Sequence, residues 1–142
     1  MKRILWLALI VFISGFTVVY GQSKGIKKGQ KNAVVEILYF HGKQRCATCI
    51  AIGNSSQEVI NKFFASEVKQ GRVAFKEIDF STPEGEKIAD KYRVSSSSLF
   101  VNQWKNGSEK PNDMTVFGFK YARNNPQVFK NGLKGKIEQL LK

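Results

Sequence analysis

Hydrophobic and polar positions along the chain predict strands and helices in turn. Residues 34–40 are almost all apolar and rich in β-branched side chains, which is typical of a strand buried on both faces. From Cys46 to Lys69 the apolar residues recur at spacings of three and four, and this spacing predicts a helix with one apolar face. Gly53 and the polar residues 54–56 predict a kink in the middle of that helix.

The rest of the chain continues the alternation and closes with a hairpin and a helix. Thr82 is a suitable cap for a helix that begins at Pro83, because proline is favoured in a first helical turn. Asn106 and Gly107 are a strong turn signal between two strands, and we expect residues 114–121 to supply the second of these strands. The predicted elements are strands at 34–40, 72–80, 99–104 and 114–121, and helices at 46–69 and 83–92 and from Pro126, with Asn125 as its cap. This order, βαβαββα, predicts an α/β fold in which a mixed sheet carries helices on both faces.

The first 21 residues have the pattern of an export signal. Lys2 and Arg3 precede a long apolar run that ends in small residues before Gln22, so we expect residues 1–21 to be a cleaved signal peptide. The alternative is an uncleaved membrane anchor, because the run approaches the length of a spanning helix. We therefore expect an exported, periplasmic protein with a flexible basic leader at 22–32 and one domain at 33–142.

Charge narrows the class of partner. The 142 residues include 23 Lys and Arg against 11 Asp and Glu, a formal net charge of +12. Such a charge attracts anionic lipid, an acidic partner or nucleic acid. We interpret the net positive charge as a solvated basic surface. We expect no nucleic-acid partner, because the chain is predicted to be exported and has no recognisable nucleic-acid-binding motif. We expect the protein to be a monomer.

Cys46 and Cys49 are the only cysteines, and two residues separate them at the start of the first predicted helix. This spacing lets the two sulfurs close a disulfide across one helical turn, which favours a redox role. Free backbone N–H groups at the helix start and the neighbouring Arg45 would lower the pKa of the Cys46 thiol. We predict that Cys46 attacks, that Arg45 stabilises its thiolate, and that Cys49 resolves the mixed disulfide.

Other uses of a cysteine pair have less support. Structural zinc needs about four ligands, and the chain has one histidine and no second cysteine pair. Covalent haem needs a histidine directly after the second cysteine, where Ile50 stands. We therefore expect neither a cofactor nor a resident metal. Two alternatives remain open beside redox chemistry: an inert structural pair, and a carrier that binds a soft metal or metalloid through both thiolates.

Two further side chains are candidates for proton transfer at the dithiol. Glu36 lies within the apolar strand, where an unpaired carboxylate is unfavourable, so it is a candidate base for Cys49. The alternative is that Glu36 lies at an edge of the sheet. His41, the only histidine, ends the same strand, and its alternative is an ordinary loop residue.

Residues 33–142 resemble the thioredoxin superfamily. The features that carry the resemblance are the buried strand, the cysteine pair at a helix start, Ile78 and Asp79 ahead of Pro83, the hairpin turn and the terminal helix. The resemblance implies a thiol–disulfide oxidoreductase acting on a protein disulfide or dithiol, and an exported reductase of this kind would need a membrane electron donor. Residues 39–49 and 121–126 also resemble small exported thioredoxin-like proteins found near arsenical-resistance genes and labelled nitrophenyl compound nitroreductase subunits.

The chain departs from the thioredoxin pattern opposite the dithiol. The cis-proline of the family falls near Ser98, and a cis bond without proline is unfavourable by about 3–4 kcal/mol. We therefore expect a trans bond between Ser97 and Ser98. We also expect Ser97, Ser98 and Leu99 to face the dithiol as a substrate-docking loop, with a plain linker as the alternative.

Overall fold

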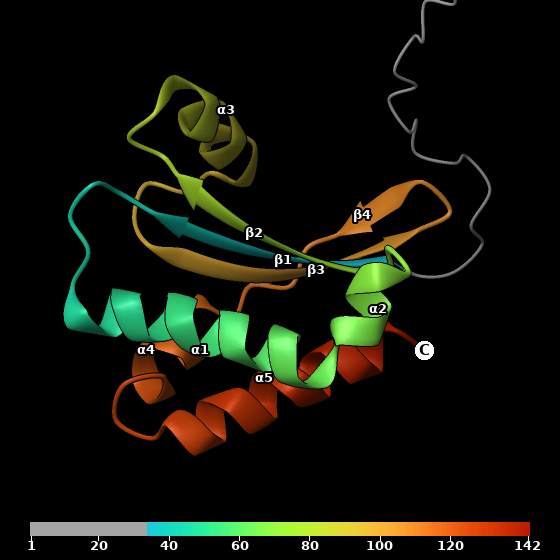
Figure 1. Cartoon of the computed structure of the whole chain (residues 1–142). Coiled ribbons are helices and arrows are strands. Elements are labelled where there is room, and N and C mark those ends of the chain that lie inside the picture. The colour runs from blue at the N-terminus through green and yellow to red at the C-terminus, as the bar shows by residue number, and fades with distance from the viewer. Residues whose placement is uncertain (1–33) are drawn as a thin grey trace, which may run out of the picture.

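A four-stranded sheet separates two unequal layers of helices (Figure 1). The structure is a computed structural model that describes residues 34–142, so the predicted signal peptide (1–21) and leader (22–32) lie outside the described residues. The elements in chain order are β1 (Val34–His41), α1 (Ala47–Phe63), α2 (Ala65–Lys69), β2 (Val73–Asp79), α3 (Pro83–Tyr92), β3 (Ser98–Lys105), β4 (Ser108–Lys110), α4 (Thr115–Tyr121) and α5 (Pro126–Leu140). No helix in this part of the chain has the length and apolar character to cross a membrane.

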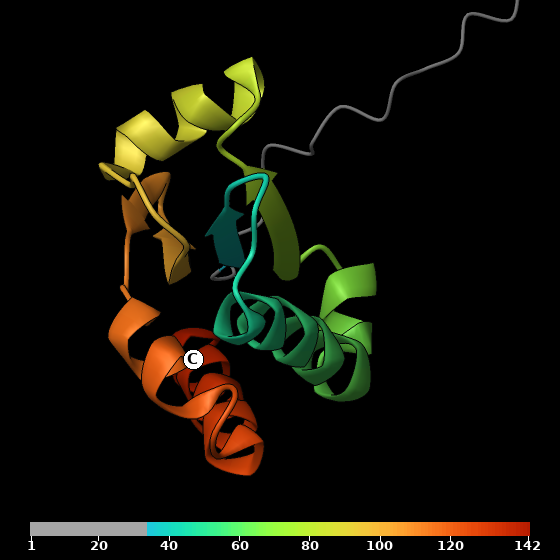
Figure 2. The ribbon, with the colours of Figure 1, turned by 90° about the vertical axis from the view of Figure 1, so that its left-hand side faces the viewer.

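The helices divide unequally between the faces of the sheet. Helix α3 covers one face, while α1, α2, α4 and α5 cover the other, as the view along the strands shows (Figure 2). The predicted fold class, an α/β fold with a mixed sheet and helices on both faces, is confirmed.

Strand β1 occupies an inner position in the sheet, whose strand order is β2-β1-β3-β4. It pairs in parallel with β2 and antiparallel with β3. Its side chains alternate between two cores, as a pleated strand requires. Val35, Ile37 and Tyr39 pack beneath α1 and α5, whereas Leu38 and Phe40 pack beneath α3. The prediction that this strand is buried on both faces is confirmed.

Strand β2 is the outermost strand of the described sheet on its side. The backbone N–H of Val35 donates to the carbonyl of Arg72, and the N–H of Phe80 donates to the carbonyl of His41. The parallel register is unbroken between these two hydrogen bonds. The backbone N–H and C=O groups of the even-numbered residues of β2 therefore form the hydrogen bonds to β1. The N–H and C=O groups of Phe75 and Glu77 therefore point toward the open edge.

Helix α1 begins where the sequence predicts and continues past the predicted kink. Gly53 and the serines after it do not bend the helix. A Cβ atom at Gly53 would lie 2.7 Å from Cε1 of Tyr39, and Ser55 and Ser56 are buried. The small side chains serve close packing against the sheet, and α1 is an unbroken α-helix at the position of the predicted kink. The helix is interrupted instead at Phe64, whose φ of −126° leaves helical geometry and whose side chain is buried.

The hairpin turn is confirmed, but its predicted partner strand is wrong. Asn106 and Gly107 both have positive φ, 53° and 76°, as a two-residue hairpin turn with the twist of the strands requires. The turn joins β3 to the short strand β4, whereas residues 115–121 form helix α4. Phe117 and Tyr121, four residues apart, pack against the main core, and Val116 is 82% exposed. The apolar spacing of this segment is therefore helical.

Candidate active site

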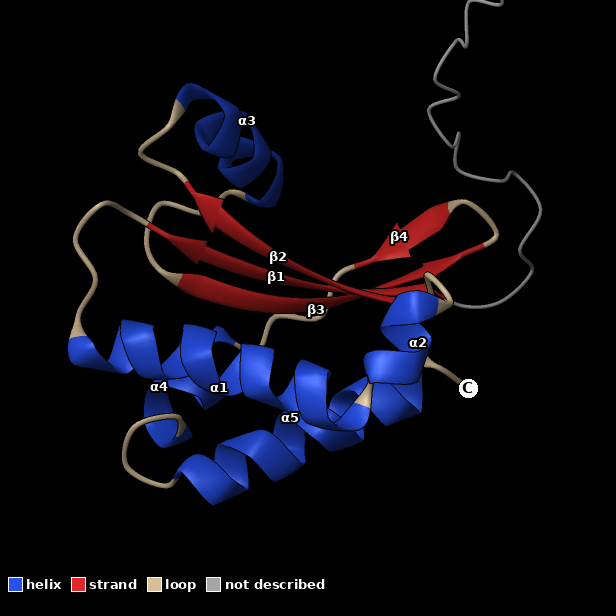
Figure 3. Ribbon diagram, in the orientation of Figure 1, coloured by secondary structure: helices blue, strands red, loops and turns tan. Residues whose placement is uncertain are grey.

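The loops that follow β1 and β2 and the loop that precedes β3 lie at one end of the sheet. Because β1 and β2 are parallel and β3 runs the other way, the ends of β1 and β2 lie beside the start of β3. This end is at the left in Figure 3, where the loop from β1 to α1 and the loop from α3 to β3 both appear in tan. The structure thus brings the predicted dithiol and the predicted docking loop to the same end of the sheet.

Cys46 and Cys49 are joined by a disulfide, with their Cα atoms 5.0 Å apart. Cys46 is the N-cap of α1, and its sulfur accepts a hydrogen bond from the backbone N–H of Cys49 at 3.1 Å. Cys46 is exposed, whereas Cys49 is buried with 6% of its surface accessible. An incoming sulfur can therefore reach Cys46 but not Cys49.

The start of α1 favours negative charge on the sulfur of Cys46. The first N–H groups of a helix have no partner within the helix and carry partial positive charge. The first turn of α1 contains no acidic residue that would oppose this field. The same N–H group that bonds the disulfide sulfur can stabilise a Cys46 thiolate after reduction.

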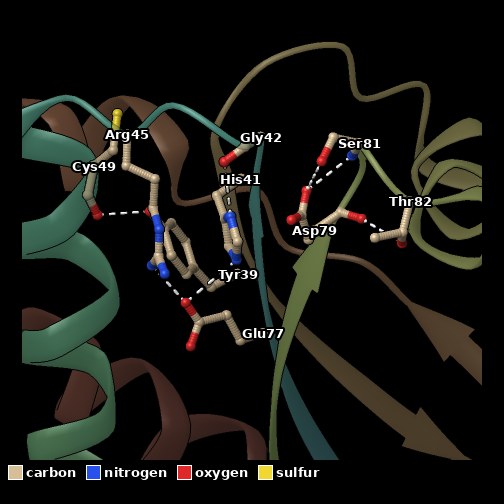
Figure 4. Close-up of polar contacts among 9 residues, drawn as sticks. All are labelled: Tyr39, His41, Gly42, Arg45, Cys49, Glu77, Asp79, Ser81 and Thr82. Atoms are coloured by element: carbon tan, nitrogen blue, oxygen red, sulfur yellow. Dashed lines mark hydrogen bonds and ion pairs between the residues drawn. The ribbon is translucent and has the colours of Figure 1, made fainter.

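Arg45 directs its guanidinium to Glu77. Its guanidinium Nη1 lies 2.5 Å from Oε1 of Glu77, and Nε2 of His41 lies 3.3 Å from the same oxygen (Figure 4). The second ring nitrogen of His41, Nδ1, lies 3.0 Å from the carbonyl oxygen of Gly42. Arg45, His41 and Glu77 therefore form a charged cluster beside the dithiol loop, which we call the Glu77 cluster.

Glu77 is not among the residues that the sequence predicts for this site. Its signal lies in strand pairing, since Glu77 is directly opposite Tyr39, and Asp79 opposite His41, in the parallel register of β1 and β2. Neighbouring residues of paired strands share a face of the sheet, so Glu77 lies on the face that carries α1. A local pattern cannot supply this register.

Tyr39 ties the first turn of α1 to the sheet. Its hydroxyl donates to the carbonyl of Cys49 at 2.6 Å. Burial raises the pKa of the phenol, although Arg45 opposes the shift. The neutral phenol therefore remains a donor throughout the pH range in which thiols exchange, and it holds the resolving cysteine in place.

The structure does not bring Glu36 to the dithiol. Glu36 shares the α3 face of the sheet with Leu38 and Phe40, near the opposite end of β1 from the dithiol loop. Its carboxylate accepts hydrogen bonds from Lys76 Nζ at 2.8 Å and from Trp104 Nε1 at 2.7 Å. These partners explain how a carboxylate is tolerated in an apolar strand. The alternative prediction, that Glu36 lies at an edge of the sheet, is wrong, because β1 lies between β2 and β3.

The serine segment leads directly into the sheet. Ser98 is the first residue of β3 and lies opposite Phe40, and its hydroxyl donates to the carbonyl of Ser96 at 3.0 Å. The bond between Ser97 and Ser98 is trans, as predicted, since residues 34–142 contain no cis peptide bond. Leu99 is fully buried, and its N–H donates to the hydroxyl of Thr115. Ser97, which is partly exposed, is the member of the three that remains accessible.

Among residues 34–142, no group of three or more His, Cys, Asp and Glu side chains is placed to hold a metal ion. A soft metal carried by the protein would bind the two sulfurs of Cys46 and Cys49 after their disulfide is reduced. Such a two-sulfur site suits a transferable metal better than a permanent structural one.

Comparison with known proteins bears on the fold. The strand and helix order, with an antiparallel hairpin following a parallel βαβ unit, has the sheet order β2-β1-β3-β4. The fold is a mixed α/β sheet with helices on both faces. No family model matches the chain, and no curated protein matches it.

Solved structures with a similar fold share little sequence with this chain. Thioredoxin O2 from Arabidopsis thaliana in the oxidised state has 22% identity and a TM-score of 0.49, over 77% of this chain and 76% of that one. A malarial protein has 20% identity and a TM-score of 0.49, over 77% of this chain and 99% of that one. The zinc-bound form of human ERp44 has 23% identity and a TM-score of 0.48, over 77% of this chain but 27% of that one. Likeness at this level does not define the role of this chain.

Proposed function

We propose that the protein is a thiol–disulfide oxidoreductase in which Cys46 is the attacking thiol and Cys49 the resolving thiol. The observation that carries the proposal is the contrast between the two sulfurs of one disulfide. Cys46 is exposed at the start of a helix, and Cys49 is buried one turn further on. An inert structural pair has no need of an exposed sulfur that accepts a helix N–H.

The exchange proceeds in two steps when the protein acts as a reductant. The Cys46 thiolate attacks one sulfur of a substrate disulfide, forms a mixed disulfide and releases the other substrate sulfur as a thiolate. The Cys49 thiolate then attacks the sulfur of Cys46 and releases the second substrate thiolate. The substrate gains two electrons, and the protein is left with its Cys46–Cys49 disulfide. The same steps in reverse oxidise a dithiol.

The substrate is a protein disulfide or dithiol that docks across the end of the sheet where the dithiol loop meets the loop before β3. Of the three predicted docking residues, Ser97 is the partly exposed one. The apolar N-terminal segment supports export to the periplasm, where a membrane electron donor would return the protein to its reduced form. The finer resemblance, to exported proteins labelled nitrophenyl compound nitroreductase subunits, agrees with this setting.

Trapping of mixed disulfides tests the roles proposed for Cys46 and Cys49. Reduced Cys49→Ser protein should accumulate a mixed disulfide with a peptide disulfide substrate, because the resolving thiol is absent. Cys46→Ser should accumulate none, because the remaining thiol is buried. Non-reducing gel electrophoresis and mass spectrometry of the adduct read the result. Equal trapping by the two variants would contradict the assignment.

The direction of electron flow follows from the reduction potential of the protein. This potential is measured on the purified chain equilibrated with dithiothreitol or glutathione buffers. A value near or below about −250 mV defines a reductase, and a value of about −120 to −180 mV defines an oxidant or isomerase. If no two-electron transition appears, the redox proposal fails. The competing function, transport of a soft metal or metalloid, would then be tested by titration with copper(I) or arsenite.

A further inference from the structure

The carboxylate of Glu77 engages the guanidinium of Arg45, the residue that directly precedes Cys46 in the sequence. Arg45 and His41 both direct nitrogens at Oε1 of Glu77, at 2.5 Å and 3.3 Å. In Figure 4 the guanidinium of Arg45 lies beside Glu77, while the sulfur of Cys49 lies toward the other end of the Arg45 side chain. The residue that precedes Cys46 in the sequence thus places its charge on β2.

Three features of the fold keep this arrangement in place. Glu77 is held by the register of β1 and β2, in which it pairs with Tyr39. His41 is buried, and its second ring nitrogen faces the carbonyl of Gly42, so the ring presents Nε2 to Glu77. Arg45 is partly shielded, with 34% of its side chain accessible. The Glu77 cluster is therefore a built arrangement that joins two strands and the dithiol loop.

We propose that Glu77 is a positioning residue that withholds Arg45 from Cys46 and thereby sets the acidity of the Cys46 thiol. A nearby cation stabilises a thiolate, and a nearby carboxylate disfavours it. Glu77 acts in both ways, since it engages the cation and adds a negative charge. The inference rests on the proposed function and concerns how strongly the same dithiol reduces.

The acidity of Cys46 bears directly on the redox equilibrium. Stabilisation of the attacking thiolate stabilises the reduced protein and makes the dithiol a stronger oxidant. By keeping Arg45 occupied, Glu77 keeps the reduced form less stable. Glu77 therefore shifts the protein toward reduction of its substrate.

Alkylation of Cys46 tests the proposal. In the Cys49→Ser background, the rate of reaction with iodoacetamide as a function of pH gives the acid dissociation constant of the Cys46 thiol. Glu77→Gln should raise this constant about threefold to fivefold, a moderate change because the pair is partly solvated. Glu77→Asp retains the charge and should restore most of the wild-type value. Glu58→Gln removes a carboxylate that pairs with Lys130 and should leave the constant unchanged.

A second substitution identifies Arg45 as the agent. When Arg45→Gln is present, Glu77→Gln should produce less than half of that increase, because no guanidinium remains to be released. In the protein with both cysteines, Glu77→Gln should shift the equilibrium with glutathione toward the reduced dithiol. A Glu77→Gln protein with an unchanged dissociation constant overturns the proposal, and so does a full increase in the absence of Arg45.

The failure of this inference is distinguishable from failure of the proposed function. Iodoacetamide reacts with any accessible thiolate and requires no substrate or resolving step. If Cys49→Ser traps mixed disulfides but the Glu77 variants do not alter alkylation, the oxidoreductase function stands and the role of Glu77 falls.

Discussion

At Gly53, a hydrogen atom in place of a side chain lets helix α1 approach the ring of Tyr39. The same ring carries the hydroxyl that holds the carbonyl of Cys49. A residue that local propensity disfavours in a helix is therefore what permits the dithiol helix to lie close to the sheet.

Replacement of Gly53 by alanine should lower the free energy of unfolding of the oxidised protein by about 1–3 kcal/mol, the usual effect of overpacking. The added Cβ would lie 2.7 Å from Cε1 of Tyr39. Gly135→Ala is the matched control, because its Cβ would meet nothing within 4 Å in α5. The control should be neutral or stabilising by up to about 1 kcal/mol, since alanine favours helix. Urea unfolding measures both variants, and equal effects would contradict the packing argument.

Some residues of the candidate site can be predicted from the sequence, and others cannot. Cys46 and Cys49 could be placed at a helix start from spacing and the preceding apolar run alone. Glu77 could not, because its partners Arg45 and His41 lie more than thirty residues away in the chain and only the register of two strands brings them together. The partners of the Glu36 carboxylate come from β2 and β3, so they too depend on strand register and not on a local pattern.

Among the elements, helix α3 begins with stabilising contacts that each join residues three apart in the chain. The hydroxyl of Thr82 accepts a hydrogen bond from the N–H of Gly85 at 3.1 Å and donates to the carbonyl of Asp79 at 2.8 Å. Because these contacts are local, the start of this helix was predictable from Thr82 and Pro83.

Thr82→Ala should destabilise the protein by about 1 kcal/mol, because it leaves the first turn of α3 without its cap. Thr82→Ser keeps the hydroxyl and should retain most of the stability. Thermal or urea unfolding distinguishes the two variants. An alanine variant as stable as the serine variant would show that the cap contributes nothing.

Elements whose partners are distant were harder to predict than elements with local signals. The turn at Asn106 and Gly107 follows from residue types that tolerate positive φ. The identity of the partner strand does not. The apolar residues of 114–121 suggest a strand, but Phe117 and Tyr121 pack at helical spacing in α4. The end of α1 at Phe64 depends on the burial of that side chain, which no local pattern contains.

At the scale of the whole molecule, one polar cluster joins α3 to the hairpin. The carboxylate of Glu109 in β4 accepts hydrogen bonds from Lys91 and Tyr92 of α3 and from Asn102 of β3. Burial alone would raise the pKa of Glu109, but these three donors hold it below the ordinary value of 4.5. Burial, reinforced by Glu109, raises the pKa of Tyr92 well above 10.0.

Stability should therefore decline at both ends of the pH range. Glu109 has a depressed folded-state pKa, so its contribution is present above about pH 4.5 and is lost as the pH falls through the folded value. The pKa of Tyr92 is raised, so its contribution is present below about pH 10 and is lost as the pH rises through the folded value.

Urea midpoints measured across this range test the assignment. Glu109→Gln should lower stability near pH 7 by about 1–3 kcal/mol and flatten the acid decline. Tyr92→Phe should flatten the alkaline decline. Glu138→Gln, which alters an exposed pair with Lys134 in α5, should leave both declines in place. An acid decline of undiminished steepness in Glu109→Gln would show that other carboxylates cause it.

Within residues 34–142, the outer edge of β2 has no further strand beside it, and this affects the behaviour of the protein at high concentration. An unpaired strand edge is a template on which a second chain can add a strand, and this is a common route to aggregation. The outward backbone groups of Phe75 and Glu77 form such a template, and the exposed charges of Lys76 and Glu77 stand in the middle of it. Burying either charge against another molecule would be unfavourable, so the two side chains act as gatekeepers. Glu77 thus lies where an uncharged substitute would alter both the chemistry of one thiol and the solubility of the protein.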